Sequence, residues 1–287
     1  MILVTAATGT VGRPLVAELA ATGHPVRALT RTPHTARFPA GVEPCDSAHP
    51  DLSGVTALFV NPAAVWDDGR SLLDAAKSAG VTRVVTLSSS SVLSGDRRHA
   101  VANRHRELEA AAESTAPEYV HLRPDAFAAN ARQWIGQIRT GDTVVGPYAD
   151  AVTAPVHEED IAAVAARALT GAIASGEAPV LTGPEPLSFA EQVRILGAAL
   201  GRPLHYEEIP RAAALDAMLA SPWMTRDMAD SLLRYFASCV ETPTPVSPDL
   251  ERILGRRGRT FESWAAERVA EFRQMDPTPR SHLLTLE

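Results

Sequence analysis

The chain has 287 residues, a formal net charge of −7 and a hydrophobic content of 45%. This acidic balance argues against a nucleic-acid-binding protein, which usually presents a basic face. No apolar run approaches the roughly 18 residues of a membrane-spanning helix, so we expect neither a nucleic acid nor a membrane as partner. The two cysteines, Cys45 and Cys239, have no metal-binding or CxxC spacing and fit a reducing cytoplasm.

The first half of the chain alternates short apolar runs with helical patterns. We expect six strands, at 2–5, 25–30, 42–46, 57–61, 83–88 and 118–123. Helices are expected between them, at 11–21, 67–79 and 98–114. This alternation is typical of the α/β class and predicts a Rossmann-type, doubly wound parallel sheet.

The second half of the chain has a different character and is mostly helical. Expected elements are a helix at 157–170, a strand at 178–183, a helix at 188–201 and further helices at 211–219, 224–237 and 260–273. We therefore predict a Rossmann domain over 1–150 and a C-terminal part over 151–287. The latter would be a small, mostly helical cap with elements that return to the main sheet. The tail from Pro277 is expected to fray.

The stretch "MILVTAATGTVGRPLV" (1–16) joins the first expected strand to a helix through small residues. Gly9 would let the backbone approach a pyrophosphate, and Gly12 would let the helix pack closely against the strand. The amides of the first helical turn would then face the anion. Ala6 stands where a further glycine would be expected, and it is tolerable if its φ is negative. A tight strand–helix turn without a ligand is the alternative.

The end of the second expected strand distinguishes between the two nicotinamide cofactors. A site for NAD usually places an acidic residue about 20 residues after the glycines, where it binds the ribose 2′-OH. This chain has "ALTRTP" (28–33) there, with no acid. Arg31 can pair bidentately with a 2′-phosphate, so the sequence favours NADP(H), although a plain surface arginine is the alternative.

Together with "VVTLSSSS" (84–91), Glu109 and "HLRPDAFAAN" (121–130), these residues resemble the NmrA-like atypical short-chain dehydrogenases over most of the chain. The usual opening in that family is TGATGxxG, so Ala6 replaces a glycine. The family contains NADPH-dependent quinone, azo and carbonyl reductases, and also nucleotide-sensing regulators without turnover. The resemblance therefore implies the fold and the cofactor more strongly than the substrate.

Site residues follow from the resemblance position by position. It implies cofactor contacts at Thr8, Gly9, Thr10, Val11 and Arg31, with Asp46 near the adenine. It also implies that Asn61, Pro62 and Ala63 line the floor after the fourth strand. Ser88 and Ser89 would approach the nicotinamide.

The tyrosine–lysine pair of ordinary short-chain dehydrogenases is absent from this sequence. Those enzymes use Tyr-x-x-x-Lys to pass a proton to the carbonyl oxygen as hydride arrives. The chain has a single lysine, Lys77, and Leu73 stands four residues before it. Alignment on Glu109 puts Val101 and His105 at the usual Tyr and Lys positions. The sequence therefore excludes the ordinary mechanism.

Two residues remain as candidate proton donors. His105 is the first, because an unperturbed imidazole has a pKa of about 6.5 and Glu109 lies on the same helix face, where it could orient the ring. A solvent-exposed His–Glu pair is the alternative. Tyr148, in the loop "VVGPYAD" (144–150), is the second, unless it is a loop aromatic that packs on the cap. Phe127, Trp134 and Tyr148 could line a substrate pocket or belong to the core.

Histidine spacing does not predict a metal site. His157 and Asp160, in "VHEED" (156–160), are expected to fix the start of a helix. The sequence as a whole predicts an NADPH-dependent oxidoreductase that reduces a small quinone, enone or carbonyl compound. A non-catalytic NADP(H) sensor acting through a protein partner is the alternative. We expect a cytoplasmic monomer or homodimer whose partner is a small-molecule substrate.

Overall fold

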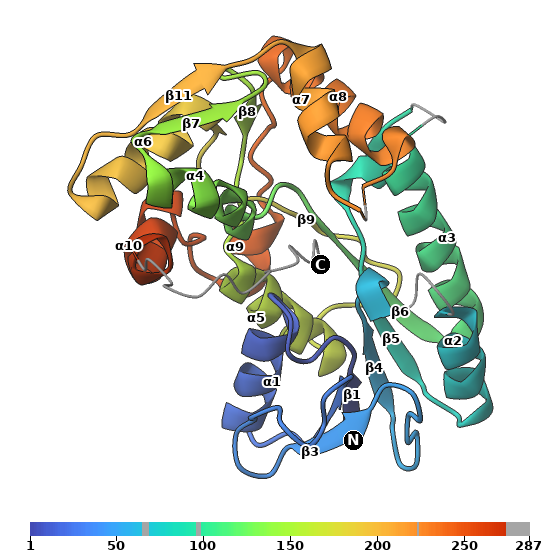
Figure 1. Cartoon of the computed structure of the whole chain (residues 1–287). Coiled ribbons are helices and arrows are strands. Elements are labelled where there is room, and N and C mark those ends of the chain that lie inside the picture. The colour runs from blue at the N-terminus through green and yellow to red at the C-terminus, as the bar shows by residue number, and fades with distance from the viewer. Residues whose placement is uncertain (65–68, 96–98, 223, 274–287) are drawn as a thin grey trace.

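The computed structural model describes residues 1–64, 69–95, 99–222 and 224–273. Its centre is a seven-stranded sheet with strand order β3-β2-β1-β4-β5-β6-β9, and every strand pair in it is parallel (Figure 1). The strands are β1 (Ile2–Val4), β2 (Val26–Thr30), β3 (Glu43–Asp46), β4 (Ala57–Val60), β5 (Arg83–Leu87), β6 (Glu118–Pro124) and β9 (Val180–Leu181). The predicted Rossmann-type sheet is confirmed.

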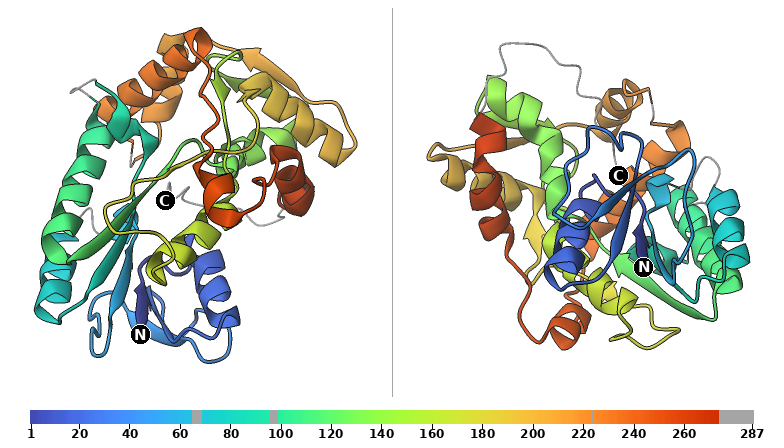
Figure 2. Two further views of the ribbon diagram at one scale, coloured as in Figure 1. Left: turned by 180° about the vertical axis from the view of Figure 1, so that it is seen from behind. Right: turned by 90° about the horizontal axis from the view of Figure 1, so that it is seen from below.

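Helices cover both faces of the sheet (Figure 2). One face carries α1 (Gly12–Ala21) and α5 (Glu158–Leu169), with α9 (Asp249–Leu254) packed behind α5. The other face carries α2 (Gly69–Ser78) and α3 (Ala100–Thr115). In β1, Ile2 and Val4 join the first core and Leu3 joins the second, as the two-residue period of a strand requires. Burial on both faces explains the unbroken apolar runs of the sequence.

A second lobe, here called the cap, lies over the carboxyl ends of the strands (Figure 1). It contains η3 (Ala128–Trp134), α4 (Ile135–Thr140), β7 (Thr143–Gly146), β8 (Val152–Thr153), β10 (Leu187–Ser188), α6 (Phe189–Leu200), β11 (His205–Glu208), α7 (Arg211–Leu219), α8 (Arg226–Glu241) and α10 (Phe261–Arg273). Strands β7 and β11 pair in parallel, and β8 and β10 pair antiparallel. An aromatic core that includes Trp134, Phe189 and Trp264 holds the cap together.

The two lobes interleave along the chain. Strand β7 precedes residue 150 but pairs with β11 of the cap, whereas β9, α5 and α9 follow residue 150 and pack on the main sheet. These placements do not divide the chain at a single point, so the division into 1–150 and 151–287 remains a prediction. The tail from Pro277 lies outside the described residues. Among the described helices, none has the length and hydropathy needed to cross a membrane.

Candidate cofactor and substrate sites

Most of the predicted cofactor residues follow the carboxyl ends of five adjacent parallel strands. The turn at Gly9 follows β1, Arg31 follows β2, Asp46 ends β3, Asn61 follows β4 and Ser88 follows β5. Because parallel strands end at one edge of a sheet, these residues lie along a single edge. The chain order reverses there between β1 and β4, and open α/β sheets bind their ligands at this switch point.

The turn after β1 is tighter than the sequence predicted. Ala6 has φ +47°, in the left-handed region, so the condition under which alanine would be readily tolerated here, a negative φ, is not met. A Cβ on Gly12 would lie 2.1 Å from the carbonyl oxygen of Ala6. The close packing of the start of α1 against this turn therefore requires glycine at 12, and Ala6 beside it adopts a left-handed conformation that is strained for alanine.

The start of α1 presents backbone amides that no side chain caps. The amide of Gly9 donates to the Ala6 carbonyl (2.9 Å), and the amide of Arg13 donates to the Gly9 carbonyl (3.0 Å). Val11 occupies the N-cap position without a side-chain hydrogen bond. Thr8, Gly9 and Thr10 are only partly buried. An uncapped, accessible helix start of this kind fits a pyrophosphate.

Arg31 directly follows β2, and Asp46 is the last residue of the neighbouring strand β3. Both are exposed, and Thr30, the residue before Arg31, is the register partner of Asp46. Asp46 accepts a hydrogen bond from the amide of Ala48 (2.9 Å), which fixes the turn after β3. Beyond the end of β2, Arg31 is the charged group at the position where an NAD site has its acid.

Asn61 is buried directly after β4. The backbone amide of Asn61 donates to the hydroxyl of Thr5 (2.7 Å), and the side-chain oxygen of Asn61 accepts from the backbone amide of Ala63 (2.9 Å). These bonds shape η1 (Pro62–Ala64), the short turn in which Pro62 and Ala63 lie. The residues that the resemblance places at the floor of the site therefore lie in a short, hydrogen-bonded turn at the switch point.

Ser88 is held in the protein interior, not directed into an open site. Its hydroxyl donates to Glu109 on α3 (2.6 Å), and Arg123 on β6 donates twice to the same carboxylate (2.9 and 2.8 Å). Burial alone would raise the pKa of Glu109, but the hydrogen bonds from Arg123 and Ser88 lower it overall. Ser89 follows at the surface edge and caps η2 (Ser90–Leu93). The Ser88–Glu109–Arg123 cluster ties α3 to the sheet.

His105 lies on α3 and is 7% exposed. Burial lowers its pKa to about 4, against the opposing attraction of Glu109. The unperturbed value of about 6.5, which made His105 a candidate, therefore does not apply to the buried ring, and burial favours its uncharged form. The carboxylate of Glu109 is bound by Ser88 and Arg123. The role of His105 as a proton donor stays a prediction.

Tyr148 lies in the cap loop after β7, with φ +53°. It packs against two apolar clusters of the cap. Trp134 is a core residue of the cap, and Phe127 packs against the main core. These aromatics are not among the described residues that line the pocket identified below. The positions of Phe127, Trp134 and Tyr148 fit the alternative reading, in which these aromatic side chains pack in the cores.

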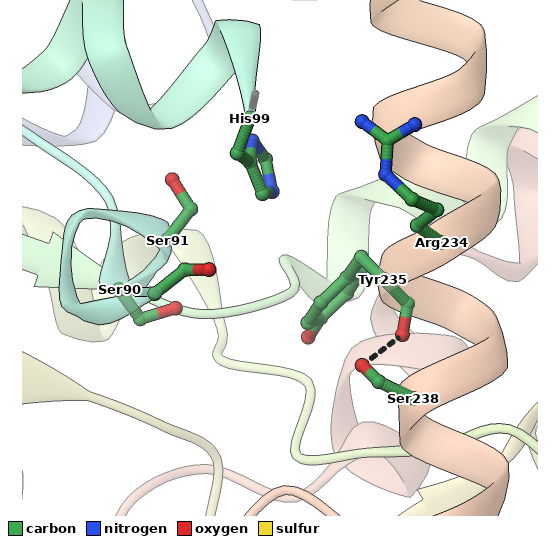
Figure 3. A pocket seen from close by; sticks show the side chains of 7 residues that line it. Ser90, Ser91, His99, Arg234, Tyr235 and Ser238 are labelled. Carbon is green, nitrogen blue, oxygen red and sulfur yellow. Dashed lines mark hydrogen bonds between the residues drawn. The ribbon is translucent and has the colours of Figure 1, made fainter. Parts of the chain in front are cut away.

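A pocket of about 300 Å³ opens between η2, the start of α3 and helix α8 of the cap (Figure 3). It adjoins the Ser88–Ser89 end of the proposed cofactor site, because η2 begins at the next residue. The described residues that line it, here called the cleft pocket, are Ser90, Ser91, Ser94, His99, Arg234, Tyr235 and Ser238.

A carboxylate joins the two sides of the cleft pocket. Asp125, just after β6, accepts hydrogen bonds from Ser90 (2.8 Å) and from the hydroxyl of Tyr235 (3.0 Å). Burial and the charge of Asp125 raise the pKa of Tyr235, so its hydroxyl stays protonated. Sequence analysis missed these residues, since Asp125 and Tyr235 are 110 positions apart and form no motif.

His157 and Asp160 fix the start of α5, as predicted. The side chain of His157 caps the helix by accepting from the amide of Glu159 (3.1 Å). Asp160 accepts from the side chain of Arg256 (2.6 Å) and from the amide of Arg259 (2.7 Å), which anchors the chain between α9 and α10. Within the described part of the chain, no three His, Cys, Asp or Glu residues cluster as a metal site would require.

Comparison with known proteins agrees with this geometry. A family model described as NAD(P)H-binding matches residues 6–172. The chain is 37% identical over 285 residues to the (4-alkanoyl-5-oxo-2,5-dihydrofuran-3-yl)methyl phosphate reductase of Streptomyces griseus subsp. griseus, covering 95% of this chain and 99% of the relative. It is 30% identical over 285 residues to the NAD(P)H azoreductase of Xenophilus azovorans, with the same coverage of 95% and 99%.

Among solved structures, the NADPH-dependent quinone oxidoreductase QOR2 of Escherichia coli, complexed with NADPH, has the same fold. It superposes with a TM-score of 0.76 at 21% identity, over 93% of this chain and 99% of that one. The chain belongs to the NAD(P)H-binding family, among the NmrA-like atypical short-chain dehydrogenases, and is an NAD(P)H-dependent reductase.

Proposed function

We propose that the protein uses NADPH to reduce a small conjugated carbonyl compound, an enone or a quinone, bound in the cleft pocket. One observation carries this proposal: the pocket adjoins the end of β5, where the resemblance places the nicotinamide. The S. griseus relative is named for a dihydrofuranone that carries an alkanoyl group and a phosphate. A conjugated lactone is therefore the acceptor we would test first, with quinones second.

The uncapped start of α1 would hold the pyrophosphate, and Arg31 would pair with the 2′-phosphate. When bound, the reduced nicotinamide supplies a hydride to the electrophilic carbon of the acceptor. Negative charge then develops on the acceptor's oxygen, where hydrogen-bond donors stabilise it. Ser90 and Tyr235 line the pocket, and each donates its single hydroxyl proton to Asp125 in the structure. Either hydroxyl would stabilise the acceptor's oxygen only by exchanging Asp125 for that oxygen as its hydrogen-bond partner. A proton completes the reduction of the double bond.

The exposed position of Arg31 makes cofactor preference testable. Replacing Arg31 with Ala removes the partner of the 2′-phosphate, so we expect NADPH binding to weaken by about 1–3 kcal/mol. Binding of NADH should hardly change, because NADH lacks this phosphate, and it serves as the internal control. Nicotinamide fluorescence titrations of both proteins measure the two affinities. An equal loss for both cofactors would remove Arg31 from 2′-phosphate recognition.

The alternative of a non-catalytic sensor is less well supported, because both relatives reported above are named as reductases. A cytoplasmic location and a monomeric or homodimeric state are part of the proposal. Cys45 and Cys239 are both buried and unpaired, which fits a reducing compartment. Size-exclusion chromatography with light scattering measures the oligomeric state.

A further inference from the structure

Three hydroxyl groups that line the cleft pocket already donate their protons. Ser90 donates to Asp125 (2.8 Å), and Tyr235 donates to the same carboxylate (3.0 Å). Ser238 donates to the backbone carbonyl of Tyr235 (2.7 Å). A hydroxyl group has one proton and two lone pairs, so each of these oxygens can still accept a hydrogen bond. To a bound molecule, these three side chains therefore offer acceptors.

Asp125 fixes the direction in which Ser90 and Tyr235 donate. Hydrogen bonds to a carboxylate are roughly twice as strong as those between neutral groups, so a neutral carbonyl on a ligand is a weaker partner. Burial and the charge of Asp125 also raise the pKa of Tyr235, so its phenol stays protonated. A ligand that donates a hydrogen bond leaves both contacts with Asp125 intact, whereas a ligand that accepts must replace one of them.

Ser91 offers a hydroxyl proton that has no acceptor. Its hydroxyl is buried and makes no hydrogen bond to the described residues, and η2 places Ser90 and Ser91 across the pocket from Tyr235 of α8 (Figure 3). A hydroxyl group on a ligand can donate to one serine and accept from the other, whereas a carbonyl only accepts and an ammonium only donates. The positive charge of Arg234, which lines the same pocket, would also repel an ammonium. The lining therefore suits an alcohol.

We propose that the acceptor carries a hydroxyl group beside its conjugated double bond, and that this hydroxyl donates a hydrogen bond to the oxygen of Ser90. This inference rests on the proposed reductase function and narrows its substrate class to hydroxylated lactones, enones and quinones. A pocket of about 300 Å³ has room for a small ring of this kind. Because Ser90 directly follows Ser89, the hydrogen bond would hold the conjugated system beside the Ser88–Ser89 end of the proposed cofactor site.

The test compares three acceptors: a conjugated lactone with a hydroxymethyl group, its methyl ether, and the analogue with a methyl group in the same place. The ether is larger than the alcohol and the methyl analogue is smaller, and neither of them can donate a hydrogen bond. For the wild type we expect kcat/KM to favour the alcohol over both by about tenfold or more, mainly through KM. In Ser90→Ala this preference should fall below about threefold, and Ser90→Thr, which keeps the hydroxyl, should restore part of it.

Ser263→Ala is the matched control. Ser263 is a partly buried serine of α10 outside the described pocket lining, and its hydroxyl donates to the carbonyl of Thr260 (2.8 Å). Its loss should leave the preference for the alcohol unchanged. Equal reduction of the three lactones by the wild type, or a preference that persists in Ser90→Ala, would overturn the inference. Equal losses of kcat with the alcohol and the ether in Ser90→Ala would assign Ser90 as a donor to the reacting oxygen and would also overturn it.

Failure of the hydroxyl contact leaves the reductase in place, because the ether and the methyl analogue are then reduced as well as the alcohol. Reduction of none of the three lactones, nor of any quinone, would instead count against the proposed function. Calorimetry of the alcohol and the ether binding to the NADP⁺ complex then decides the contact separately. Binding of the alcohol that is about tenfold tighter than that of the ether, with this preference lost in Ser90→Ala, supports the contact. Equal binding of the two, or no binding, overturns it.

Discussion

At the scale of single residues, Ala6 has a strained backbone at the place where α1 packs closely against the turn after β1. Ala6 has a φ of +47°, and its carbonyl lies against Gly12 at the start of α1. A left-handed alanine costs about 1–2 kcal/mol, and glycine would relieve this cost while adding up to about 1 kcal/mol of backbone entropy to the unfolded state. The two effects differ by a small amount in favour of glycine.

We therefore expect Ala6→Gly to raise the free energy of unfolding by up to about 1 kcal/mol, measured by urea denaturation. Ala7→Gly is the matched control. Ala7 is fully buried in the main core and is not left-handed, so its replacement should destabilise the protein. Equal destabilisation by both substitutions would contradict the strain at Ala6.

His105 connects burial with pH dependence. Its pKa is lowered to about 4 in the folded protein, against about 6.5 in the unfolded chain. The unfolded state therefore binds more protons between these values, and the free energy of unfolding should fall by up to about 3 kcal/mol as the pH drops from 6.5 to 4. Above pH 6.5 this residue adds no pH dependence.

Urea denaturation of wild type and His105→Gln at pH 7, 5.5 and 4.5 measures this effect. The variant should lose less stability over the window than the wild type, because titration of the other groups is common to both. Parallel losses would show that His105 titrates normally. The same variant, assayed for kcat at pH 7, tests the predicted role of His105 as a proton donor, and an unchanged kcat would exclude it.

At the scale of elements, Tyr235 joins helix α8 of the cap to the end of β6 through Asp125. In the structure the proton of this hydroxyl is donated to Asp125, so Tyr235 would stabilise charge on the acceptor only if the acceptor's oxygen replaced Asp125 as its partner. In that case Tyr235→Phe should lower kcat about 100-fold, with NADPH affinity unchanged. Tyr206→Phe is the matched control, since its hydroxyl donates to the carbonyl of Pro147 inside the cap (2.8 Å). We expect Tyr206→Phe to lower the free energy of unfolding and to leave kcat unchanged. Equal kcat values for the two variants would remove Tyr235 from the reaction.

The elements that sequence could predict are those with a strong local pattern. Strands β1 and β4 are buried on both faces and read as continuous apolar runs, and helix α6 begins with a capping box formed by Ser188 and Glu191. Strand β11 was missed because its sequence, HYEE, is mostly exposed and polar. Strands β8 and β10 have two residues each, too few for a periodic signal.

The same limit applies to the sites. The predicted cofactor residues follow successive strands, so the turn at Gly9 and the arginine after β2 could be recognised from local sequence. The cleft pocket instead joins η2 and α3 to α8, and its central contact spans 110 residues. Neither Tyr235 nor Arg234 lies in a recognisable motif. Only the folded arrangement brings them opposite Ser90 and His99.

At the scale of the whole molecule, the cap closes over the carboxyl edge of the sheet (Figure 1). A buried carboxylate helps to join the lobes: Glu158 at the start of α5 faces Arg132 of η3 (3.6 Å) and Arg268 of α10 (3.4 Å). The sheet thus carries the predicted cofactor residues at its carboxyl edge, and α8 of the cap supplies one wall of the cleft pocket. This division allows one cofactor site to serve different acceptors through changes in the cap alone.

The account's central claim is direct reduction of an acceptor bound in the cleft pocket, and an isotope experiment tests it most directly. The purified protein is mixed with NADPH that carries two deuterium atoms at C4 of the nicotinamide, together with a conjugated lactone, and the product is analysed by mass spectrometry. We predict one deuterium in each product molecule, at the electrophilic carbon, and one hydrogen from water at the neighbouring position. Consumption of NADPH without deuterium in the product, or no consumption with any lactone or quinone, would contradict the account.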